Sequence, residues 1–187
     1  MDWIRMSEEK RAVKQKGLVM VYTGNGKGKT TAALGMLMRA WGRDMQTAVI
    51  QFIKAEGRPT GEKKAAERMG IEMLQVGDGF TWESKDLDQS TALARHGWEI
   101  AKRKIKDARY DIIVLDEFTF PLRFKWLDTA EVIQWLKENK PQKLHIVITG
   151  RHAPRELVQF ADLVTEMREI KHPFHDQGLL SQPGVDF

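Results

Sequence analysis

The sequence of 187 residues contains no cysteine, which excludes disulfide bonds, thiolate zinc sites and a cysteine nucleophile. It also contains no apolar run of membrane-spanning length, and its first 17 residues are charged throughout, unlike the apolar core of a signal peptide. We therefore expect a cytoplasmic protein without a membrane partner, in which any bound metal relies on oxygen or imidazole ligands.

A strong excess of one charge is absent as well. The 30 Lys and Arg residues are interspersed among 26 Asp and Glu residues, and the net charge is only +4. This distribution favours an ordinary solvated surface, with a few cations reserved for phosphates, over a surface built for nucleic acid. We therefore expect no nucleic-acid partner.

No internal repeat, low-complexity tract or linker rich in proline, glycine or serine divides the chain. Its length and its apolar content of 42% suffice for one hydrophobic core, so we predict a single domain over residues 1–187. Within it, residues 1–16 are predicted to form a mobile helix or arm, and residues 172–187 an irregular tail packed on the surface. Either end segment is a candidate cover for an active site.

Apolar stretches of strand length alternate with stretches of helical periodicity, which predicts an α/β fold with a mostly parallel central sheet. The expected strands are residues 18–22, 48–53, 71–76, 112–115, 144–149 and, more weakly, 163–167. The expected helices are residues 30–41, 61–69, 87–108 and 130–138. Right-handed crossovers bring the carboxyl ends of parallel strands to one edge of the sheet, where we expect the ligand crevice.

The most informative segment, residues 19–31, combines an apolar strand, a glycine-rich turn and a helix start. Its glycines allow backbone N–H groups to face phosphate oxygens, and the helix that begins near Thr30 adds the positive end of its dipole. Lys29 can reach the terminal phosphates, and the Thr30 hydroxyl can ligate Mg²⁺. The loop departs from the pattern G-x-x-x-x-G-K-[ST], because its first glycine comes one place late and because Lys27 adds a cation. The predicted nucleotide-binding residues are Gly24, Asn25, Gly26, Lys27, Gly28, Lys29, Thr30 and Thr31.

Two carboxylates, Asp116 and Glu117, follow the strand expected at residues 112–115. In P-loop proteins a carboxylate at this position faces the loop and holds Mg²⁺ directly or through water. An exposed acidic turn is the alternative, but the upstream phosphate loop favours the metal role. We predict Thr30 and Glu117 as metal ligands, with Asp116 as the other candidate.

Arg151 follows the strand expected at residues 144–149, so we predict that its guanidinium reaches phosphate oxygens. The alternative is an ordinary surface arginine. Lys54, also at a strand end, and Arg39 are weaker candidates of the same kind, with Arg39 expected on the outer face of its helix. Lys27, Lys29 and Arg151 are the predicted catalytic cations.

A glycine-rich stretch precedes Phe80 and Trp82, two large aromatics that no strand or helix pattern explains. Such aromatics either meet a planar ligand or fix the loop tip in the core, and composition alone slightly favours packing. His172 and His175 have a spacing that sometimes binds metal, but no third ligand stands nearby, so we expect no metal there. The sequence contains no pattern of a nucleophile with its general base, so the substrate is expected to supply the nucleophile.

Together these motifs resemble the P-loop class of ATP:corrinoid (cobalamin) adenosyltransferases. The resemblance spans residues 18–184 and is carried by residues 23–33, 51–54, 79–82, 114–117, 149–151 and 170–174. The phosphate loop alone is common, whereas its combination with Gly-Phe-Thr-Trp at residues 79–82 and Lys-His-Pro-Phe at residues 171–174 is specific. Residues 55–59 depart from the family, which has Gly-x-Trp after the lysine.

The resemblance implies a three-layer, RecA-like P-loop NTPase fold and transfer of the 5′-deoxyadenosyl group of ATP to the cobalt(I) of a corrinoid. Triphosphate is released, and the reaction serves adenosylcobalamin biosynthesis or salvage. Cobalt(I) itself attacks C5′, so the protein needs a clamp for the leaving triphosphate rather than a general base. In the family the triphosphate binds in the reverse sense from ordinary P-loop ATPases.

By the same resemblance, Phe80 and Trp82 pack against the lower axial face of the corrin. There they displace the lower ligand and favour four-coordinate cobalt(II), which is easier to reduce. The expected cofactor is Mg²⁺, with ATP as co-substrate and the corrinoid as acceptor. An electron-donating flavoprotein reductase and a second copy in a homodimer are the expected partners, and residues 1–16 are expected to act as a lid.

Two other functions stay open on the sequence alone. A RecA-like ATPase uses Glu117 to orient water and releases ADP and phosphate, and a nucleic-acid-binding ATPase shows strongly salt-dependent binding. The acceptor is likewise open among an early corrinoid intermediate, cobinamide and complete cobalamin.

Overall fold

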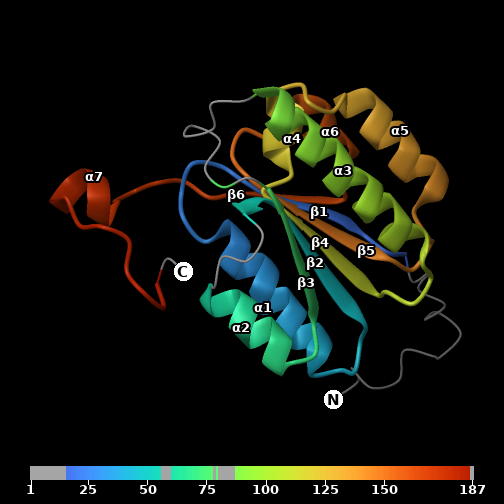
Figure 1. The fold of residues 1–187 in the computed structure, drawn as a ribbon, viewed down its shortest axis with the longest axis horizontal. Helices are drawn as coiled ribbons and strands as arrows, with labels where there is room; N and C mark the ends of the chain where they lie inside the picture. Colours follow the sequence, from blue (N-terminus) through green and yellow to red (C-terminus); the bar gives the residue numbers. More distant parts are fainter. Residues whose placement is uncertain (1–15, 56–59, 78, 80–86, 186–187) are drawn as a thin grey trace, which may run out of the picture.

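The structure is a computed structural model that describes residues 16–55, 60–77, 79 and 87–185 (Figure 1). Its strands are β1 (Val19–Thr23), β2 (Thr47–Ala55), β3 (Glu72–Gly77), β4 (Ile112–Asp116), β5 (His145–Thr149) and β6 (Leu163–Glu166). They form one six-stranded sheet in the order β3-β2-β4-β5-β1-β6, and all neighbouring strands run parallel. The predicted α/β fold is confirmed.

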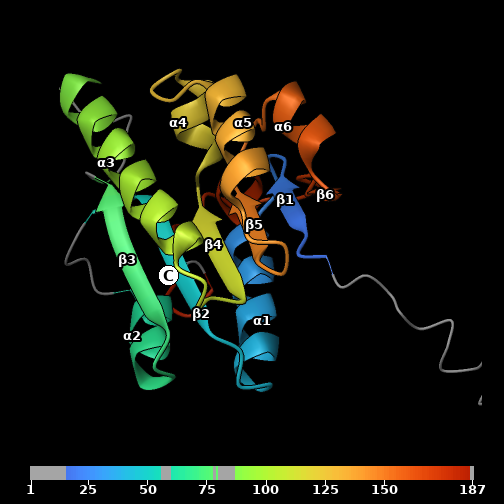
Figure 2. The ribbon, with the colours of Figure 1, turned by 90° about the vertical axis from the view of Figure 1, so that its right-hand side faces the viewer.

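The helices are α1 (Lys29–Trp41), α2 (Gly61–Arg68), α3 (Leu87–Lys106), α4 (Thr119–Arg123), α5 (Thr129–Asn139), α6 (Arg155–Phe160) and α7 (Pro173–Gln177). Figure 2 shows α1 and α2 on one face of the sheet and α3, α5 and α6 on the other. The four long helices lie close to the predicted ranges. The periodic pattern does not predict α4, α6 and α7, because five or six residues are too few to repeat an apolar face.

The core has two parts, one on each face of the sheet. Ile113 belongs to the cluster that contains Trp98 of α3, whereas its neighbour Val114 belongs to the cluster that contains Leu37 of α1. This alternation follows from the two-residue period of a strand, and all five residues of β4 are buried because helices cover both faces. The buried sheet is the rigid base from which the strand ends project.

The predicted C-terminal tail is irregular except for one short helix. Residues 173–185 are exposed and contain α7, which stands away from the three layers in Figure 1. Trp41, the last residue of α1, is 49% exposed, and its indole N–H donates to the Met69 carbonyl at 2.9 Å. Arg39 is exposed on α1, as expected. None of the helices in the described ranges is long and apolar enough to cross a membrane.

Candidate nucleotide-binding site

The carboxyl ends of the strands surround a cavity of about 760 Å³. Residues 26–31, which follow β1, form one side, and Lys54, Glu117 and Arg151 line it from the ends of β2, β4 and β5. The remaining lining residues come from α1, α2 and the C-terminal segment: Leu34, Gly61, Glu62, Pro173, Gly184 and Val185. The cavity therefore lies at the edge of the sheet that was predicted from right-handed crossovers between parallel strands.

The glycine-rich loop needs glycine for two separate reasons. Gly28 caps α1 with φ of 104°, a left-handed conformation that side chains disfavour. Gly26 lies against the segment after β6, where an added Cβ would come within 2.6 Å of the Arg168 carbonyl oxygen. Its N–H donates to the Met167 carbonyl at 2.7 Å, so this distant segment supports the loop.

Lys29, the first residue of α1, is 6% exposed and lies inside the loop. Its ammonium donates to the carbonyls of Gly24 at 2.8 Å and Gly26 at 2.6 Å. Burial lowers the pKa of Lys29, and the nearby carboxylates of Glu117 and Asp116 oppose that change. A cation held this way next to the helix N-terminus suits the phosphates of a nucleotide.

Asp116 connects the loop to the neighbouring strands. The buried carboxylate accepts hydrogen bonds from Thr30 Oγ1 at 2.8 Å and Thr149 Oγ1 at 2.7 Å, both through Oδ1. Its Oδ2 accepts a bond from Gln51 Nε2 at 3.0 Å. Because three elements converge on one carboxylate, the Thr30 hydroxyl has a defined position at the edge of the cavity.

Glu117 is strained and lacks a hydrogen-bond partner on one oxygen. Its φ is 58°, its N–H donates to Thr149 Oγ1 at 2.9 Å, and its buried Oε2 has no hydrogen-bond partner among the described residues. Burial, and then the charge of Asp116, raise the pKa of Glu117 from 4.5 to about 7. An unpartnered buried carboxylate oxygen indicates that a cation or donor completes this site.

The oxygen atoms of Thr30, Asp116 and Glu117 are donors that suit Mg²⁺. Within the described ranges, no group of three or more His, Asp and Glu residues is arranged to hold a metal alone. A cation shared with phosphate oxygens needs only one or two protein ligands. The donor set therefore fits Mg²⁺ bound together with a nucleotide.

Not every predicted site residue lines the cavity. Gly24 and Asn25 lie outside the described lining, and the Gly24 carbonyl instead supports Lys29. Phe80 and Trp82 lie outside the described residues. Gly79, just before them, donates its N–H to the Ile53 carbonyl at 2.9 Å, so this loop begins next to Lys54.

Sequence reasoning missed Glu62, whose position in the first turn of α2 follows the N-cap residue Thr60. A Thr-Gly-Glu signal before a helical pattern does predict a helix start, but not that the carboxylate faces the cavity. The contribution of Pro173, Gly184 and Val185 was also missed, because it depends on the path of the C-terminal segment.

Comparisons with known proteins give the family of this chain. The family model described as "ATP:corrinoid adenosyltransferase BtuR/CobO/CobP" matches residues 15–187. A corrinoid adenosyltransferase of Sinorhizobium sp is 46% identical over 176 residues, which cover 92% of this chain and 81% of that protein. Corrinoid adenosyltransferases of Escherichia coli (strain K12) and Salmonella typhimurium are each 40% identical over 177 residues, 95% of this chain and 89% of theirs. The resemblance inferred from the motifs is confirmed, and the chain belongs to the ATP:corrinoid adenosyltransferase BtuR/CobO/CobP family.

Proposed function

We propose that this protein transfers the 5′-deoxyadenosyl group of ATP to the cobalt(I) of a corrinoid, in adenosylcobalamin biosynthesis or salvage. The observation that carries the proposal is a phosphate loop that shares one cavity with Lys54, Glu117 and Arg151, in a chain of this family. The cobalt(I) of the substrate donates its electron pair to C5′, the cobalt–carbon bond forms, and the C5′–O bond breaks. Triphosphate leaves with the electrons of that bond.

In this reaction the protein stabilises the leaving group. Negative charge grows on the triphosphate as the C5′–O bond breaks, and cations already in position stabilise it without reorganisation. We assign this role to Lys29, Lys27 and Arg151, with the backbone N–H groups of residues 24–31 as further donors. The burial of Lys29 supports the assignment, because a shielded charge acts more strongly than an exposed one.

Mg²⁺ is the proposed metal cofactor, held by Thr30 and Glu117, with Asp116 positioning Thr30 and available as a second carboxylate. The orphaned Oε2 of Glu117 supports this assignment. When bound, Mg²⁺ neutralises charge on the triphosphate. The displaced first glycine and Lys27 support the reverse orientation of the triphosphate, which leaves C5′ accessible to the corrin.

Phe80 and Trp82 are the proposed contacts to the lower face of the corrin. Gly77 is packed against the Ile53 backbone and Gly79 donates its N–H to the Ile53 carbonyl, which supports the assignment because the loop that carries the aromatics then starts beside the cavity. We also propose that residues 1–16 act as a lid and that a flavoprotein donates the electron. The proposed location of the protein is the cytoplasm. The exposed apolar side chains of the C-terminal segment, such as Ile170 and Leu180, support a homodimer.

Product analysis tests the proposal. The purified protein is mixed anaerobically with ATP, Mg²⁺ and chemically reduced cobinamide or cobalamin, and the corrinoid spectrum and the phosphate products are recorded. We expect an adenosylated corrinoid and one equivalent of triphosphate. ADP and phosphate without adenosylated corrinoid would instead identify an ATPase.

A further inference from the structure

A salt bridge joins two lining residues that come from different elements of the cavity. Lys54, near the end of β2, donates to Oε1 of Glu62 in the first turn of α2. The Lys54 side chain is 29% exposed and that of Glu62 12%, so the pair is largely shielded from water. Shielded ion pairs are less screened than surface pairs, and the position of each charge matters more.

The Glu62 carboxylate has a fixed position because α2 is capped at its N-terminus and is also bonded to the neighbouring strand β3. Thr60 caps the helix by accepting from the Lys63 N–H at 3.4 Å, and the Lys63 ammonium donates to the Met73 carbonyl in β3. Burial by itself raises the pKa of Glu62, but hydrogen bonds from Lys54, from its own backbone N–H and from Thr60 lower it overall. The carboxylate is therefore ionised at neutral pH.

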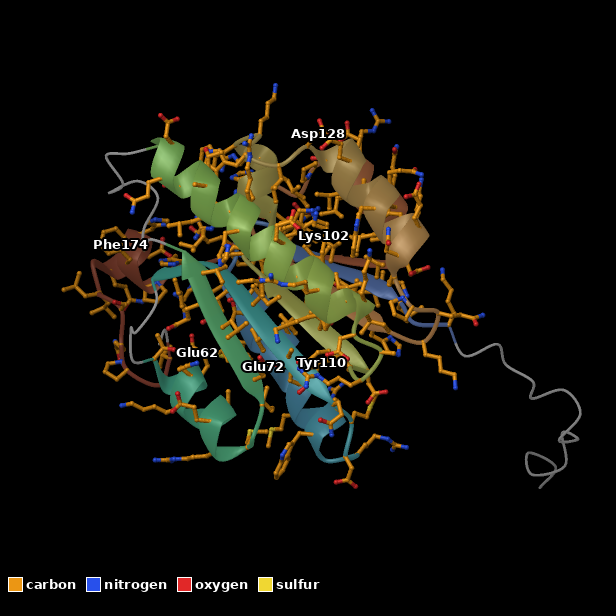
Figure 3. All side chains as sticks on the ribbon, turned by 45° about the vertical axis from the view of Figure 1, so that its right-hand side comes forward. Glu62, Glu72, Lys102, Tyr110, Asp128 and Phe174 are labelled. Carbon is orange, nitrogen blue, oxygen red and sulfur yellow. The ribbon has the colours of Figure 1, made fainter. Side chains whose placement is uncertain are left out.

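Figure 3 shows Glu62 at the end of α2 that faces the C-terminal segment, whereas Glu72 and Tyr110 lie toward the other end of the sheet. Lys54 lines the cavity together with two carboxylates, Glu62 and Glu117. It is paired with Glu62, and its charge also lowers the pKa of Glu117, although this is the smallest of the effects on that group. A lysine freed from Glu62 therefore still has Glu117 as an attracting anion on the same cavity.

We infer that Glu62 is a positioning residue, which holds the Lys54 ammonium at the rim of the cavity for the triphosphate and keeps it from pairing with Glu117. The inference rests on the proposed function, because it requires a triphosphate in this cavity. Lys54 is then a further binding cation, and Glu62 acts through it.

Whether loss of the Glu62 charge weakens or tightens binding of a polyanion distinguishes a positioning role from simple electrostatic repulsion. A carboxylate at the rim repels a polyanion, so loss of its charge alone makes the cavity more positive and tightens binding. Loss of a positioning carboxylate releases Lys54 and weakens binding, although the repulsion is also lost. Glu62→Gln preserves the size of the side chain and tests these opposite expectations.

The experiment is a double-mutant cycle, in which the full chain is titrated calorimetrically with inorganic tripolyphosphate in the presence of Mg²⁺. Glu62→Gln and Lys54→Met are each expected to raise Kd about 3- to 10-fold, and the double variant is expected to bind no more weakly than Lys54→Met alone. Glu67→Gln is the matched control, because Glu67 lies on the same helix, is 63% exposed and pairs only loosely with Lys63 at 4.0 Å. Its Kd is expected to equal that of the parent.

Two results overturn the inference. Tighter or unchanged binding by Glu62→Gln shows that Glu62 does not position Lys54, and an equal loss with and without Lys54 shows that it acts independently of that lysine. Thermal unfolding of each variant checks the fold; if Glu62→Gln unfolds, Glu62→Asp takes its place in the cycle with the same criteria. A different result overturns the proposed function itself: no tripolyphosphate binding by the parent, or full binding by Lys29→Ala.

Discussion

The support of the phosphate loop by the segment after β6 leads to a quantitative prediction for Gly26→Ala. The backbone of Gly26 can accommodate alanine, because its φ is not positive, so the substitution acts through contact alone. The added Cβ would lie 2.6 Å from the Arg168 carbonyl oxygen and 2.7 Å from its carbonyl carbon, whereas ordinary contacts begin at 3.4 Å. Both opposing atoms belong to the backbone, so no side chain can rotate away.

The required displacement breaks the hydrogen bonds that hold the loop. The Gly26 N–H donates to the Met167 carbonyl at 2.7 Å, and the Met167 N–H donates to the Thr23 carbonyl at 2.8 Å. Overpacking costs about 1–3 kcal/mol and each of the two lost hydrogen bonds about 1 kcal/mol, so we expect Gly26→Ala to be destabilised by about 3–5 kcal/mol. Because the moved segment is the loop itself, the variant is also expected to bind ATP weakly.

Urea unfolding followed by circular dichroism measures the stability, and calorimetry measures ATP binding. Gly35→Ala is the control, because Gly35 lies in α1, the helix that follows the loop, with nothing within 4 Å of the added Cβ. Alanine there is expected to stabilise the protein by about 0.5–1 kcal/mol with ATP affinity unchanged. The reasoning is refuted if Gly26→Ala matches the parent in stability and ATP affinity.

Three further predictions concern the site. Lys29→Ala is expected to abolish transfer because the triphosphate loses its buried cation, and a near-parent rate at saturating ATP in the spectroscopic assay would contradict that role. Trp82→Ala is expected to bind ATP like the parent but to react poorly with cobalt(II) cobalamin under reducing conditions; equal activity there returns Trp82 to a packing role. Glu117→Gln is expected to stabilise the protein without ATP and Mg²⁺ at high pH, because burial and then Asp116 raise the pKa of Glu117 from 4.5 to about 7. Between pH 4.5 and about 7 the folded parent keeps a proton on Glu117 that the unfolded chain has lost. The free energy of unfolding of the parent therefore falls as the pH rises through this range, by about 3 kcal/mol in all. Urea unfolding at pH 5 and pH 8 measures this, and a variant-to-parent difference that does not grow with pH contradicts it.

Sequence alone determined the features that depend on neighbouring residues. The phosphate loop was predictable because its glycines, Lys29 and Thr30 are contiguous, and a turn that starts a helix needs no distant contact to be recognised. The strands were predictable from apolar runs, and the edge that binds ligands followed from the parallel topology. Asp116 and Glu117 were candidates because they end a buried strand.

Only the tertiary structure decided how these parts support one another. The sequence did not indicate that Arg168 lies against Gly26, that Thr30 and Thr149 share the Asp116 carboxylate, or that Glu62 holds Lys54. Such contacts depend on the distances and angles between elements far apart in the chain, and no local period encodes those. The sequence therefore predicted the phosphate loop itself. The support of the loop by the segment after β6, and the pairing of the charges around it, depend on the arrangement of the sheet and its crossovers.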